Sequence, residues 1–94
     1  MEQFYIIRGD RSGVFFGEIA ERNGREVTIR NARRLWYWGG ATDCCQLAAD
    51  GVSKPNRCKF TVTVPSVTIL DAIEILPCTT KAKESIQGVA VWSA

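Results

Sequence analysis

The chain has 94 residues, a formal net charge of +2 and a hydrophobic fraction of 46%. These values describe one globular domain over residues 1–94, near the lower end of the size that buries a sufficient core unaided. So mild a charge argues against a general nucleic-acid coat protein, and no apolar run approaches the roughly 20 residues of a membrane span. The N-terminus lacks the features of a signal peptide, so we expect a cytosolic protein without membrane association.

The first part of the chain predicts β-strands. Asn23-Gly24 lies between two strand-like runs and predicts a tight hairpin turn with positive φ at both residues. Asn31-Ala32 interrupts the alternation of the strand after this turn, and we expect a bulge there. The expected strands cover residues 3–8, 14–20 and 26–38.

The second part predicts two short helices and two further strands. Thr42 is the expected N-cap of the first helix, whose free N–H groups would attract an anion, and Gly51 is expected to end it. A turn is expected at Pro65-Ser66. The helices are expected over residues 42–50 and from Thr79 or Thr80 to Gly88, and the strands over 59–64 and 67–76. The predicted fold class is α+β, mainly β: a small antiparallel sheet or open barrel of about five strands with two short helices.

The inventory of reactive side chains predicts no enzyme, no metal site and no cofactor. The sequence contains no histidine, which removes the usual general base near neutral pH. Its acidic residues are scattered singly rather than paired. The four cysteines, Cys44, Cys45, Cys58 and Cys78, include no C-x-x-C pair, so we interpret them as small buried hydrophobic residues.

The stretch TIRNARRLWYWGGAT, from Thr28 to Thr42, carries the strongest functional signal. It holds three arginines, three adjacent aromatics and no acid. Guanidinium groups bind phosphate and aromatic faces stack on bases, so the combination favours nucleotide binding. Two simpler readings stay open, in which the aromatics form core and interface or the arginines are solvated surface. Large residues on both faces of this strand also predict a covering partner, for which a homo-oligomer is the simplest source.

Five motifs distributed over nearly the whole chain resemble a family of small phage and bacterial proteins that long lacked an assigned function. Through that family, the chain is similar to viral sponge proteins, which sequester the cyclic nucleotide signals of CBASS-type or Thoeris-type anti-phage immunity. The motifs are RSGVFFGEI (Arg11–Ile19), NARRLWYWGGA (Asn31–Ala41), QLAADGV (Gln46–Val52), CKFTVTV (Cys58–Val64) and AIEILPCT (Ala72–Thr79).

The resemblance implies a phage or prophage anti-defence protein in the host bacterial cytoplasm. Its ligand would be a cyclic di- or oligonucleotide or a cyclic ADP-ribose-like molecule, bound without cleavage. The alternatives are a phage module that binds single-stranded nucleic acid or protein, with nucleic acid disfavoured by the low net charge, and a purely structural subunit. Arg11 and Ser12 are included in the site because their glycine-bounded turn suits close phosphate approach. The expected ligand-contacting residues are Arg11, Ser12, Arg33, Arg34, Trp36, Tyr37 and Trp38.

Overall fold

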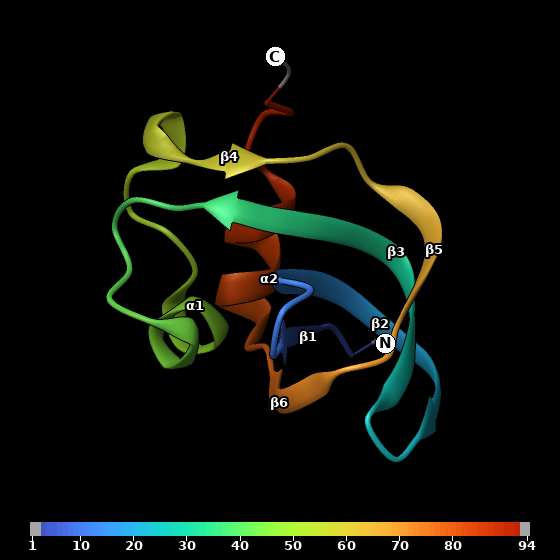
Figure 1. The fold of residues 1–94 in the computed structure, drawn as a ribbon. Helices are drawn as coiled ribbons and strands as arrows, with labels where there is room; N and C mark the ends of the chain where they lie inside the picture. Colours follow the sequence, from blue (N-terminus) through green and yellow to red (C-terminus); the bar gives the residue numbers. More distant parts are fainter. Residues whose placement is uncertain (1–2, 93–94) are drawn as a thin grey trace.

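The computed structural model describes residues 3–92 and has an α+β, mainly β fold, as predicted. Six antiparallel strands form one open sheet in the order β4-β3-β2-β1-β6, and β5 pairs with β3 beside β4. Figure 1 shows the two helices on one side of this curved sheet. The elements are β1 (Tyr5–Gly9), β2 (Val14–Asn23), β3 (Glu26–Tyr37), α1 (Cys44–Asp50), the short 3-10 helix η1 (Pro55–Arg57), β4 (Lys59–Phe60), β5 (Val64–Ile69), β6 (Ala72–Pro77) and α2 (Thr80–Gln87).

Each face of the sheet has its own apolar core. Consecutive residues point to opposite faces of a strand, and Ile6-Ile7 and Phe15-Phe16 are buried on both. The helices cover one face, where Ile6 and Phe16 pack against residues of α1 and α2 such as Leu47. The other face is enclosed by the curl of the sheet, as β5 and β6 bring apolar residues against Ile7 and Phe15. A sheet with two apolar faces explains why β1 reads as a continuous hydrophobic run.

The predicted bulge in β3 is confirmed at Asn31, whose φ is 52°. Phe16 pairs with Arg33 and Glu18 pairs with Arg30, so β3 carries one more residue than β2 between these pairs. Gly17 lies opposite the bulge, where a Cβ atom would come within 2.5 Å of the Ile29 side chain. The extra residue reverses the alternation along β3 and so decides which later side chains face the helices.

The turn between β2 and β3 differs from the prediction by one residue. Asn23 pairs with Glu26, so the two central residues are Gly24 and Arg25. Gly24 has a φ of 63°, while Asn23 and Arg25 are not among the residues with positive φ. Glycine at the first central position fits a type II′ turn, in which only that residue needs a positive φ.

The boundaries of the strands after η1 also differ from the prediction. The expected turn at Pro65-Ser66 is wrong, because both residues lie within β5. Proline is tolerated there because, among the strands of residues 3–92, β5 pairs with β3 alone and leaves its other edge unpaired. The chain turns instead at Leu70-Asp71, which divides the expected strand over 67–76 into the end of β5 and β6. This break gives six strands in place of about five.

Both helices are present, and the N-cap of the second is Thr79, one of the two predicted candidates. The Thr79 hydroxyl accepts a hydrogen bond from the Ala82 N–H at 3.1 Å, and Gly88 ends α2. The predicted cap of α1 is wrong by one residue, because Asp43 rather than Thr42 is the N-cap. Gly51 ends α1 as predicted, with a φ of 76°. Among residues 3–92, no helix is long and apolar enough to cross a membrane.

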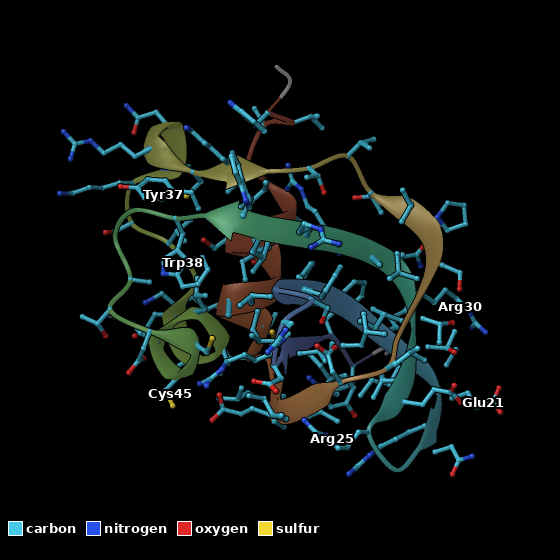
Figure 2. The ribbon with its side chains drawn as sticks, in the orientation of Figure 1. Glu21, Arg25, Arg30, Tyr37, Trp38 and Cys45 are labelled. Atoms are coloured by element: carbon cyan, nitrogen blue, oxygen red, sulfur yellow. The ribbon has the colours of Figure 1, made fainter. Side chains whose placement is uncertain are left out.

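The four cysteines are free thiols, and Cys44, Cys58 and Cys78 are buried as predicted. Burial raises the pKa of Cys78 to about 11 and is also the main cause of the raised pKa of Cys44. Both groups are therefore protonated near neutral pH and act as small apolar side chains. Cys45 is the exception, since its side chain is exposed on α1 (Figure 2).

Candidate ligand-binding surface

The structure divides the arginine-aromatic stretch between the two faces of β3. Arg33 faces the helices and is only 4% exposed. Its Nε donates to the Thr61 carbonyl at 2.8 Å, its Nη1 to Ile86 at 2.8 Å and its Nη2 to Val89 at 2.5 Å. The guanidinium carbon also lies 5.4 Å from the centre of the Phe60 ring. Arg33 thus holds β3 to the C-terminal end of α2, where a cation is favoured by the helix dipole.

Arg34 points to the other face, and its side chain is exposed. Its guanidinium carbon lies 4.5 Å from the centre of the Phe15 ring, and its Nη1 donates to the Ser12 carbonyl. A cavity of about 230 Å³, lined in part by Arg34, Phe15 and Val67, opens beside it. The two adjacent arginines therefore have separate surroundings, and only Arg34 is available to a ligand on the outer side of the sheet.

The turn that contains Arg11 and Ser12 already binds a carboxylate from within the chain. Asp71 Oδ2 accepts the Arg11 N–H at 2.7 Å and the Ser12 N–H at 3.0 Å, and Asp71 Oδ1 accepts the Ser12 hydroxyl at 2.7 Å. The Ser12 hydroxyl is the main cause of a lowered pKa at Asp71, followed by the Arg11 N–H. The donors expected to receive phosphate thus hold the loop between β5 and β6 against the loop between β1 and β2.

Replacing Asp71 with asparagine is expected to lower the melting temperature near pH 7, because the amide cannot accept all three hydrogen bonds. The wild-type carboxylate has a lower pKa when folded than its unfolded value of about 3.9. Its stabilising effect is therefore complete well above that value and is lost as the pH falls through the folded pKa. Melting curves at several pH values should show that the difference between the two melting temperatures becomes smaller in acid. An equal difference at all pH values would contradict this role, and Asp10→Asn, at an exposed carboxylate, is the control.

Trp36 and Tyr37 are the exposed aromatics of the stretch, at 61% and 57% exposure. Trp92, from the chain after α2, lies across β4 with its ring centre 5.1 Å from that of Trp36. The backbone N–H of Trp92 donates to the carbonyl of Phe60 in β4. Lys59 completes the group, with its Nζ between 5.4 and 5.9 Å from the centres of all three rings. We call Trp36, Tyr37, Lys59 and Trp92 the aromatic surface.

Trp38 and the start of α1 do not belong to the aromatic surface. Trp38 is half-buried and packs against the core on the helix side, and Figure 2 shows it below Tyr37 at the end of β3. The N-terminus of α1 is occupied by the chain itself: Asp43 Oδ1 accepts the Gln46 N–H at 3.0 Å, and Gln46 Oε1 accepts the Thr42 N–H at 2.7 Å. The expected anion site at this terminus is therefore filled by local side chains.

The sequence pattern missed two members of the aromatic surface. Lys59 and Trp92 are not among the ligand-contacting residues that the sequence predicts. Their proximity to Trp36 depends on the pairing of β4 with β3 and on the bridge between Phe60 and Val91, which joins the C-terminal segment to β4. No local pattern encodes contacts over such distances along the chain.

The aromatic surface can stack planar groups and attract anions. Exposed tryptophan faces bind bases through stacking, and an ammonium group beside them supplies positive charge for phosphate. Among its four residues there is no carboxylate, thiol or imidazole to transfer a proton.

Comparison with known proteins gives a family without an assigned activity. Searches of curated proteins and of solved structures found no match. The model of one protein family, described as Domain of unknown function (DUF6948), matches residues 2–86. That match spans most of the 94 residues, and we conclude that the chain belongs to the DUF6948 family.

Proposed function

We propose that this protein binds and sequesters a cyclic nucleotide immune signal without cleaving it. In this proposal it is a phage or prophage anti-defence sponge that acts in the host bacterial cytoplasm. The observation that carries the proposal is the aromatic surface, in which Trp36, Tyr37 and Trp92 surround Lys59. Trp36 and Tyr37 are more than half exposed, and Trp92 is partly exposed. Large aromatics are costly to leave in water, so such a group on a small protein marks a binding surface.

The chemistry of a cyclic nucleotide fits this surface. Its bases offer planar faces to Trp36 and Trp92, and each stacked base contributes about 1–3 kcal/mol. Its phosphates need cations. Lys59 supplies one within the aromatic surface, and Arg34, two residues before Trp36 on β3, supplies another. Cleavage would need an activated nucleophile at the bound phosphate, and the four residues of the aromatic surface include no carboxylate, thiol or imidazole to activate one. Retention of the intact ligand is the expected outcome.

A second copy of the chain would complete the site. Trp36 and Tyr37 are exposed on a single chain, whereas sequestration requires that the ligand be largely enclosed. A homo-oligomer that brings two aromatic surfaces together would place stacking groups on both sides of the bases. The ligand and the interface would then share residues, so ligand binding should strengthen assembly.

The proposal is tested with a panel of cyclic di-AMP, cyclic GMP-AMP, cyclic triadenylate and cyclic ADP-ribose. Each compound is titrated into the protein by calorimetry. The complex is then heated, and the released compound is identified by chromatography. Sequestration predicts tight binding of at least one compound and its recovery unchanged. Recovery of a cleaved product, or no binding by any member of the panel, would overturn it.

Binding of single-stranded nucleic acid is the second candidate, because aromatics beside a lysine also form stacking platforms for single strands. Labelled single-stranded oligonucleotides distinguish the two functions. Affinity that falls steeply with salt concentration, together with no binding of the cyclic compounds, would favour this candidate.

A further inference from the structure

A groove on the helix side of the sheet is distinct from the aromatic surface. It has a volume of about 500 Å³ and lies between β3 and α2. The stacked rings of Phe4 and Phe16, with centres 4.9 Å apart, line it together with polar side chains from both elements. The polar groups used below are Asn31 and Arg33 from β3 and Lys83 and Gln87 from α2.

Arg33 brings a buried positive charge to this groove without a carboxylate to balance it. Its three hydrogen bonds go to carbonyl oxygens, which are dipoles rather than charges. The ion pairs among residues 3–92 join Arg8 to Glu74 and Lys81 to Asp50, and neither involves Arg33. Buried charges are usually paired, because removing an ion from water is costly. Two of the five N–H groups of a guanidinium also remain after these three bonds.

The other polar residues add donors around the same space. Lys83 and Gln87 are four residues apart on α2 and so share one helix face. The Lys83 Nζ lies 4.9 Å from the centre of the Phe4 ring, at the wall of the groove. Glu18 is an acidic neighbour of the groove, and its Oε2 accepts a hydrogen bond from Asn31 Nδ2 at 2.6 Å. No acidic side chain is among the described residues that line the groove.

We infer that the groove binds a phosphate group, with Arg33 and Lys83 as its cationic ligands and Gln87 as an amide donor. Two cations match the charge of a phosphate near pH 7, and charge-assisted hydrogen bonds to a guanidinium are the strong class of such contacts. A free phosphate and a phosphate carried by a small molecule present the same oxyanion to these donors. This site does not depend on the aromatic surface or on the proposed sponge function.

The test is a titration with sodium phosphate near pH 7 at constant ionic strength, followed by two-dimensional proton–nitrogen NMR. The Arg33 Nε–H signal is expected to shift and saturate, while that of Arg34, on the other face of β3, stays in place. Because substitution of Arg33 threatens the fold, the variant is Lys83→Gln, expected to weaken phosphate binding about five-fold or more. The matched control is Lys81→Gln, at an exposed lysine of the same helix that pairs with Asp50.

Three outcomes would overturn the inference: no saturable shift of the Arg33 signal, equal phosphate affinities of Lys83→Gln and Lys81→Gln, or acetate binding as tightly as phosphate. Trp36→Ala separates this site from the proposed function, because it should leave the phosphate titration unchanged. If the protein binds phosphate but none of the cyclic nucleotides, the phosphate site in the groove is supported and the proposed sponge function is rejected.

Discussion

Replacing Arg33 with methionine is expected to lower the free energy of unfolding by about 3 kcal/mol or more. Methionine keeps much of the length and apolar contact of arginine but cannot donate hydrogen bonds. The carbonyls of Thr61, Ile86 and Val89 would lose the donor that now joins them. A domain of this size has about 5–15 kcal/mol of stability in total, so the loss should be obvious in a urea titration.

Arg34→Met is the matched control, one residue further along the same strand. Its guanidinium is exposed and its hydrogen bond to Ser12 lies in solvent, so the expected loss is below about 1 kcal/mol. Equal losses for the two variants would contradict the structural role given to Arg33. A large loss at Arg34 alone would show that the alternation along β3 has been assigned to the wrong faces.

Trp36→Ala is expected to weaken binding of the tightest cyclic nucleotide in the panel about ten-fold or more. Loss of one stacked base contact costs roughly 1–3 kcal/mol, and each 1.4 kcal/mol is about a factor of ten. Trp36 is 61% exposed, so the free energy of unfolding should change by less than about 1 kcal/mol. Calorimetric titration and urea unfolding of the same samples separate the two effects.

Two controls sharpen the Trp36 experiment. Trp36→Phe keeps an aromatic face and should retain more affinity than the alanine variant. Leu70→Ala removes a side chain that is 70% exposed in the turn between β5 and β6, and it should not change binding. If Leu70→Ala weakens binding as much as Trp36→Ala, the loss reflects general surface disturbance and the aromatic surface is not the site.

The fold class and most elements could be predicted because their signals are local. The bulge at Asn31 and the caps at Thr79, Gly51 and Gly88 are set by residues close in sequence. The strands after η1 could not be placed in the same way. Pro65 looked like a turn residue, but an edge strand with one partner tolerates it, and that position in the sheet depends on long-range pairing.

The two arginines in succession show why the candidate site was only partly predictable. The sequence makes Arg33 and Arg34 equal members of one basic, aromatic stretch. The bulge at Asn31 decides which of them faces α2, and the carbonyls that bind Arg33 come from residues 28 to 56 positions later. The Arg11–Ser12 turn was likewise predicted to accept an anion, but Asp71, about 60 positions away, provides one within the fold.

Native mass spectrometry of the protein after incubation with the cyclic nucleotide panel tests the sponge proposal most directly. It reports the number of chains in each assembly and the mass of any compound held by them. The account predicts an oligomer that gains the mass of one panel member, which is released at that same mass on denaturation. A protein that gains no mass from any panel member, or that releases a smaller fragment, would contradict it.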